Sequence, residues 1–225
     1  YRLLIPELIT EYDKVIYSDV DIIFRMDLSE LYHTNIESYY LAATRDIGLN
    51  FSDGGIKYIS SVNGLPQGEY LQSGFIMMNC KKMLQDKLVD KFRNFAKVKL
   101  EYQDQDILNL TCCGSVLLLP IKYNMTDSSY YFLNKERHKV SSILIGENVY
   151  DAMNHGNIHF NGHKPWKKYS INFDIWWEYY RKSPFFDEKF YFDFFYYRLN
   201  IFDQLSLWKR IKILVRYFVY GKRII

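Results

Sequence analysis

Short runs of apolar residues alternate along this chain with segments whose apolar residues recur at helical spacing. Buried strands are predicted where the runs occur, at residues 13–17, 40–44, 71–79, 116–119 and 157–160. Over 81–97 the apolar positions fall at i, i+4, i+8 and i+11, which predicts an amphipathic helix. Helical segments are also expected over 1–11 and 104–110, and a short helix or turn over 26–32. Strands that alternate with helices favour an α/β domain with a mainly parallel sheet.

A pair of carboxylates interrupts this pattern at the end of the first strand. Asp19 and Asp21 come just after the apolar residues Val15 to Tyr17, with Ser18 between. Burial of two unpaired carboxylates costs several kcal/mol or more. Hard oxygen ligands of this kind bind divalent cations, which often also hold substrate phosphates. Since the same pattern is common in solvated turns, the residues alone leave both interpretations open.

A second interruption covers residues 50–69, which are rich in Gly, Ser and Asn. This composition predicts a long loop. Loops of that length in compact domains are usually functional or disordered.

The C-terminal part of the chain differs from the rest in composition. Ten aromatic residues lie in 185–202, which we interpret either as a helix at the edge of the core or as a surface that faces a membrane or an acceptor. From 205 onward the apolar residues form one helical stripe, with basic residues elsewhere on the helix: Leu207, Trp208, Ile211, Leu214, Val215 and Phe218, against Lys209, Lys212 and Arg216. This favours an interfacial helix on an anionic membrane. A packing helix with a solvated basic face is the alternative.

Charge and cysteine content narrow the class of protein. Of the 29 Lys and Arg in the 225 residues, six lie in 205–225, which leaves 23 against 26 Asp and Glu elsewhere. A mildly acidic body with a basic tail argues against a nucleic-acid partner. Three cysteines, Cys80, Cys112 and Cys113, make no disulfide framework and indicate a reducing compartment. There is no run of 18 apolar residues.

Four motifs occur in order along the chain: Tyr17-Ser18-Asp19-Val20-Asp21, Tyr102-Gln103-Asp104-Gln105-Asp106-Ile107-Leu108-Asn109, Leu119-Pro120-Ile121-Lys122-Tyr123-Asn124 and His159-Phe160-Asn161-Gly162-His163-Lys164-Pro165-Trp166. This series resembles the family 8 retaining glycosyltransferases, and within them the bacterial enzymes that add galactose or glucose to lipopolysaccharide-type glycans. The resemblance implies a GT-A fold, a nucleotide-binding α/β sandwich. It further implies a catalytic domain over 1–183 that lacks the first nucleotide-binding strands, by truncation or natural loss, and a helical tail over 184–225.

The resemblance also implies the ligands of a metal and of the donor phosphates. Asp19, Asp21 and His159 match the family's ligands of a divalent ion, Mn²⁺ or Mg²⁺. Gly162 and Lys164 resemble the family's phosphate-binding residues, although the spacing from the histidine to the lysine is one residue shorter than expected. The implied donor is a UDP-sugar.

The remaining site residues follow from the same resemblance. Arg2 and Asp46 match donor contacts, and Asp104 and Gln105 match the pair at the reacting centre. Gln72 stands where the family usually has an Asn that contacts the sugar, so its longer amide leaves the donor sugar in doubt.

The function that these resemblances imply is transfer of a hexose from a UDP-sugar to a hydroxyl of a glycan or lipid-linked acceptor. Because the sequence offers no strong nucleophile beside the metal motif, attack from the leaving-group face is expected. The expected location is cytoplasmic, on the inner face of the cell membrane. Two alternatives stay open, an inactive or truncated sugar-nucleotide-binding module and a nucleotidyltransferase or hydrolase.

Overall fold

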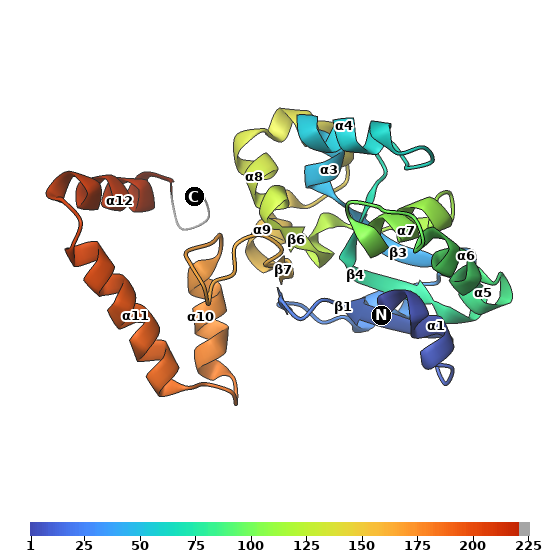
Figure 1. The fold of residues 1–225 in the computed structure, drawn as a ribbon, viewed down its shortest axis with the longest axis horizontal. Coiled ribbons are helices and arrows are strands. Elements are labelled where there is room, and N and C mark those ends of the chain that lie inside the picture. Colours follow the sequence, from blue (N-terminus) through green and yellow to red (C-terminus); the bar gives the residue numbers. More distant parts are fainter. Residues whose placement is uncertain (221–225) are drawn as a thin grey trace. The chain divides into compact units, whose positions relative to one another are not determined.

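The computed structural model describes residues 1–220 (Figure 1). These form two compact units, one over Tyr1–His159 and one that begins at Phe160, and each is described by itself. The two units are divided after His159, whereas the sequence analysis expects a boundary between catalytic domain and tail after residue 183. That domain boundary stays a prediction. No helix in the described range is long and apolar enough to cross a membrane.

The first unit is built on a four-stranded mixed sheet in the order β1 (Lys14–Ser18), β4 (Leu71–Asn79), β3 (Leu41–Arg45), β5 (Val116–Leu118). β4 runs antiparallel to both neighbours, whereas β3 and β5 are parallel. The expected α/β fold with a mixed sheet flanked by helices is confirmed, but two of the three strand pairings in this sheet are antiparallel, so the sheet is not mainly parallel. A strand covered on both faces is a continuous apolar run whichever way its neighbours point, so the sequence pattern did not reveal strand direction.

A small second sheet has the order β2 (Ile22–Ile23), β7 (Ile158–His159), β6 (Met125–Thr126). β7 pairs antiparallel with β2, and Ile22 lies opposite His159. This pairing brings the segment after β1 to a histidine far along the chain.

Helices cover both faces of the large sheet. On one face, side chains of α5 (Cys80–Gln85), α6 (Leu88–Phe95) and α7 (Gln103–Cys112) form a core cluster with Ile76 and Met78 of β4. On the other face, Phe75 and Met77 pack with Leu31 of α2 (Ser29–His33). Burial from both sides explains why all nine residues of β4 are buried.

The other helices of this unit are short: η1 (Arg2–Leu4), α1 (Ile5–Leu8), α3 (Ile47–Phe51), α4 (Asp53–Ser61), η2 (Ile121–Tyr123), α8 (Asp127–Lys135), η3 (Arg137–Ile143) and α9 (Val149–His155). The helix predicted over 81–97 is divided into α5 and α6. Lys87, between them, has φ 53°, a left-handed conformation that a continuous helix does not allow.

The long loop expected over 50–69 is found only in its second part: α4 occupies 53–61, whereas 62–69 contain no helix or strand. Two polar side chains cap the helices here: Asp46 accepts from the Leu49 N–H before α3, and Ser52, one of the residues that suggested a loop, accepts from the Gly55 N–H before α4. Ile59 of α4 then packs in a cluster with Tyr70. The structured segment therefore joins the core directly beside β4.

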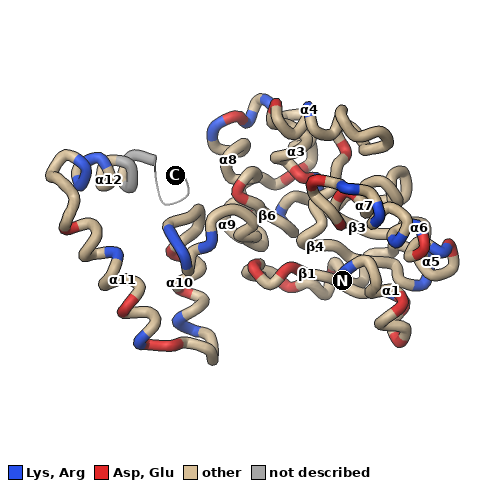
Figure 2. Tube along the Cα trace, viewed as in Figure 1, with Lys and Arg blue, Asp and Glu red and all other residues tan. Residues whose placement is uncertain are grey.

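The second unit contains α10 (Phe173–Lys182), α11 (Glu188–Asp203) and α12 (Leu207–Tyr220). Trp177 of α10 is buried against Phe194 and Phe195 of α11, with ring centroids 4.7 and 4.9 Å apart. The predictions of an aromatic helix and of a following amphipathic helix are confirmed at the level of secondary structure. Basic residues occur along α12 (Figure 2), while Lys222 and Arg223 lie outside the described residues.

Candidate metal and donor site

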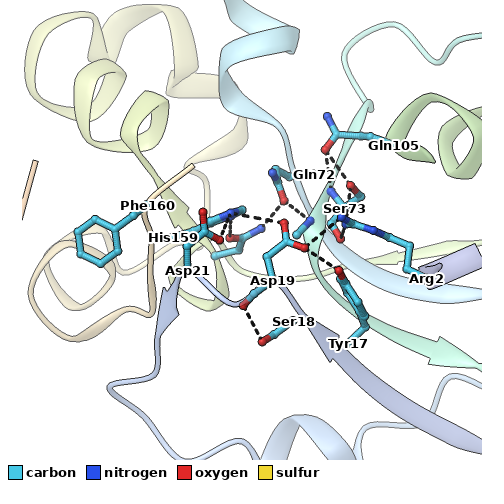
Figure 3. Close-up of polar contacts among 12 residues, drawn as sticks. Arg2, Tyr17, Ser18, Asp19, Asp21, Gln72, Ser73, Gln105, His159 and Phe160 are labelled. Carbon is cyan, nitrogen blue, oxygen red and sulfur yellow. Dashed lines mark hydrogen bonds and ion pairs between the residues drawn. The ribbon is translucent and has the colours of Figure 1, made fainter. Parts of the chain in front are cut away.

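Asp19, Asp21 and His159 converge in the first unit, as the sequence predicts. Asp19 follows β1, Asp21 precedes β2, and His159 ends β7 (Figure 3). One ligand atom from each lies within 4.8 Å of the others. The His159 Nε2 is 3.3 Å from Asp21 Oδ1 and 3.7 Å from Asp19 Oδ2. Two carboxylates and one buried imidazole are a donor set that fits a divalent cation such as Mn²⁺.

Gly74 makes room for this cluster from the centre of β4. A Cβ atom at this position would lie 2.2 Å from His159 Cε1 and 2.8 Å from Asp19 Oδ2. Only glycine lets the strand backbone approach the ligands so closely. The sequence feature that could have pointed to Gly74 is a glycine inside an otherwise apolar strand, because this pattern often marks the close approach of another group.

Arg2 connects the candidate metal ligands to α7. Its guanidinium contacts Asp19 Oδ1 at 3.0 Å and Asp104 Oδ2 at 2.6 Å, and it donates to the Ser73 carbonyl. Tyr17 also donates to Asp19 Oδ1, at 2.7 Å. Burial, together with that hydrogen bond, raises the pKa of Tyr17 to about 12. Asp19 is thus held in place by a cation and a protonated phenol.

Gln105 lies beside this network, buried in the first turn of α7. Its Oε1 accepts from both the N–H and the hydroxyl of Ser73, and its Nε2 donates to Asp46 Oδ2 at 3.1 Å. Burial raises the pKa of Asp46, while the hydrogen bonds from Leu49 and Gln105 oppose that rise. The structure therefore brings Arg2, Asp46, Asp104 and Gln105 together, and their roles toward a donor stay predictions.

Gln72 lies in β4, close to the candidate metal ligand His159. Its Oε1 accepts from the Gly74 N–H at 2.5 Å and from Asn124 Nδ2 at 2.9 Å. Its expected contact with a sugar stays a prediction.

Asp106 is a site residue that sequence reasoning did not single out. Its fully buried carboxylate accepts from the hydroxyls of Tyr58 and Tyr70, each at 2.5 Å, and from the Tyr102 N–H. Burial and the bond to Asp106 raise the pKa of Tyr58 to about 12 and raise that of Tyr70 further. The carboxylate thereby ties α4 and the start of β4 to the N-terminus of α7. The sequence feature that could have pointed to Asp106 is a second acidic residue directly after Gln105, within a predicted helix.

Gly162 and Lys164 belong to the second unit. There the Lys164 ammonium donates to the Phe160 carbonyl at 2.5 Å. Their role in phosphate binding stays a prediction.

A mixed sheet flanked by helices, with acidic groups at the strand ends, is the architecture of GT-A glycosyltransferases, and solved enzymes of that class match this chain. The model of glycosyl transferase family 8 matches residues 1–170, and the chain belongs to this family.

Particular relatives agree with that assignment. The lipopolysaccharide 1,2-glucosyltransferase of Escherichia coli K12 is 28% identical over 163 residues, which are 71% of this chain and 46% of that enzyme. A crystal structure of an active-site mutant of LgtC is 26% identical, with a TM-score of 0.68 over 84% of this chain and 68% of LgtC. The galactosyltransferase LgtC with donor and acceptor sugar analogues is 28% identical, with a TM-score of 0.58 over 73% of this chain and 59% of that one. The chain spans about half the length of the curated relatives it matches.

Proposed function

We propose that this protein is a metal-dependent retaining hexosyltransferase that moves galactose or glucose from a UDP-sugar to a hydroxyl of a cell-surface glycan. The observation that carries the proposal is the convergence of Asp19, Asp21 and His159 on one point beside the Arg2–Asp104 ion pair. The named activities of the relatives, transfer of glucose to lipopolysaccharide and galactosyl transfer, support the sugar class.

Asp19, Asp21 and His159 would hold Mn²⁺ or Mg²⁺. Once bound, such an ion supplies Lewis-acid neutralisation of charge on the leaving nucleoside diphosphate. Arg2 orients Asp104 through its 2.6 Å contact, so that the carboxylate can accept hydrogen bonds from donor-sugar hydroxyls. Arg2 also adds positive charge next to Asp19, which is suited to an anionic donor.

Retention of configuration is proposed to result from attack on the leaving-group face. Gln105 is a neutral amide whose oxygen already accepts two hydrogen bonds, so it is a poor nucleophile. The Asp106 carboxylate is buried and accepts three hydrogen bonds, which lowers its reactivity in the same way. The acceptor proton would pass to the leaving diphosphate.

The proposal is tested by incubating the protein with Mn²⁺, a panel of UDP-sugars and a lipopolysaccharide acceptor, and measuring UDP release and sugar transfer. Asp21→Asn and His159→Ala should each lower Mn²⁺-dependent transfer by about a hundredfold or more, because a ligand is lost. Chelation should abolish transfer, and added Mn²⁺ should restore it. Asp13→Asn is the matched control, since this exposed carboxylate lies just before β1 instead of just after it.

Other outcomes separate the alternatives. Binding of a UDP-sugar without any turnover would favour a sugar-nucleotide-binding module. Release of pyrophosphate in place of UDP would favour a nucleotidyltransferase. Transfer that is insensitive to both ligand substitutions would contradict the proposed metal site.

We also propose that α11 and α12 bind the anionic inner face of the cell membrane, where lipid-linked acceptors lie. α11 has no buried residue, and exposed aromatic side chains on it include Phe192 and Tyr196. Trp208 of α12 is 79% exposed and is followed by Lys209 and Arg210. Exposed aromatic groups combined with basic ones are typical of interfacial helices.

A further inference from the structure

A chain of three hydrogen bonds leads from the backbone of β4 to the proposed metal ligand His159. Gly74 N–H lies 2.5 Å from the terminal amide of Gln72. The Gln72 amide lies 2.9 Å from that of Asn124, and Asn124 lies 3.0 Å from His159 Nδ1. Gln72, Asn124 and His159 are all at least nine-tenths buried.

The backbone N–H fixes the direction of every bond in this chain. Because Gly74 N–H can only donate, the Gln72 atom beside it is the oxygen Oε1. The Asn124 atom that contacts the same oxygen must then be the donor Nδ2. Asn124 therefore presents Oδ1 to His159, and Nδ1 of the imidazole carries the proton.

The opposite ring nitrogen is thereby directed at the two carboxylates. In a neutral imidazole with its proton on Nδ1, the lone pair is on Nε2, the atom that lies 3.3 Å from Asp21 and 3.7 Å from Asp19. The other tautomer would turn a proton toward the metal position and leave Asn124 Oδ1 without a donor from His159.

We infer that Gln72 and Asn124 are positioning residues that set the metal-binding tautomer of His159. This inference rests on the proposed metal-dependent function. It also gives a reason for glutamine at position 72: its side chain reaches back to the Gly74 N–H of its own strand and across to Asn124 at once. Groups that fix a ligating histidine from its far side typically change metal affinity by about 10- to 100-fold when they are removed.

The first measurement is the Mn²⁺ affinity of the protein without donor, by titration calorimetry. Gln72→Met keeps the side-chain length but removes the acceptor, and should weaken Mn²⁺ binding by about 10-fold or more. Asn124→Leu should weaken it by a similar or larger factor. Gln72→Glu retains an oxygen for both donors and should keep the wild-type affinity. Gln67→Met is the control, because Gln67 is an exposed residue.

The second measurement needs no metal. The ¹⁵N shifts of the His159 imidazole in metal-free protein, assigned by comparison with His159→Gln, should show the proton on Nδ1. In Gln72→Met and Asn124→Leu the ring should show a mixture of tautomers. Thermal unfolding establishes that each variant is folded, and if Gln72→Met does not fold, Asn124→Leu provides the test.

Two results would overturn the inference: an unchanged tautomer in both variants, or altered donor selectivity in Gln72→Met with unchanged Mn²⁺ affinity, which would assign Gln72 to the sugar pocket. Failure of the proposed function would be seen in a different measurement, because wild-type protein would then bind no Mn²⁺. The tautomer measurement would still decide whether the hydrogen-bond chain orients His159.

Discussion

Strand β4 and helix α11 are both rich in large apolar residues, yet their environments are opposite. All nine residues of β4 are buried, including the polar Gln72 and Ser73. Of the sixteen residues of α11, none is buried, although Phe192 and Tyr196 are among them. Polar groups are buried in the strand, and aromatic rings are exposed on the helix.

The difference shows what burial depends on in this protein. β4 is paired on both edges and covered on both faces, so even its polar side chains are enclosed, and each finds hydrogen-bond partners. Within its own unit, α11 packs on α10 around Trp177. Composition determines which segments can be buried, whereas pairing and packing determine which are.

The largest expected effect comes from removing a buried phenylalanine of β4, and the same substitution in α11 is the comparison. Phe75→Ala in β4 deletes a fully buried ring that packs beside Phe24 and Tyr123, and should lower the free energy of unfolding by about 3–5 kcal/mol. Phe192→Ala removes a ring that is 59% exposed, and should change it by less than about 0.5 kcal/mol. Urea denaturation followed by circular dichroism measures both. Equal losses would contradict the contrast between the two elements.

A smaller effect is expected from adding one methyl group to β4. Gly74→Ala places Cβ 2.2 Å from His159 Cε1, so the ligand must move. The unfolding free energy should fall by about 1–3 kcal/mol, and Mn²⁺ affinity should fall with it. Gly54→Ala in the first turn of α4 is the control: apart from its chain neighbours and its own helix backbone, no atom lies within 4 Å of the added Cβ, and the change should stabilise the protein by about 0.4–1 kcal/mol. Wild-type Mn²⁺ binding by Gly74→Ala would contradict the proposed ligand geometry.

The smallest expected effect concerns the exposed surface of the second unit. In sedimentation with phosphatidylglycerol vesicles, Trp208→Ser should weaken binding, and Lys209→Gln should weaken it by about fivefold, equivalent to about 1 kcal/mol per basic residue near an anionic surface. Added salt should reduce binding further. Tyr150→Ser, which alters a 75% exposed aromatic residue of the first unit, is the control. Vesicle binding that is unchanged by salt and by Trp208→Ser would contradict a role for α12 and would favour Phe192 and Tyr196 of α11 as the membrane contacts.

Much of the element pattern was available from the sequence. The five apolar runs correspond to β1, β3, β4, β5 and β7, and aromatic or amphipathic spacing anticipated α11 and α12. Spacing did not reveal strand direction, since β4 is apolar because both its faces are covered. It also missed α4 within 50–69, where Ser52, a polar residue that looked like a loop former, caps the helix.

For the site, the sequence by itself supplied the candidate residues. Asp19, Asp21 and His159 are residue types that suit a divalent cation, and the motifs that contain them resemble those of the family 8 enzymes. Only the tertiary structure decided that they meet, because the pairing of β2 with β7 sets Ile22 opposite His159 across a long stretch of chain. The tertiary structure alone also decided the hydrogen-bond partners of Gln72. They are Gly74 on its own strand and Asn124 from far along the chain, because a side chain can bond only to the neighbours that folding brings within reach.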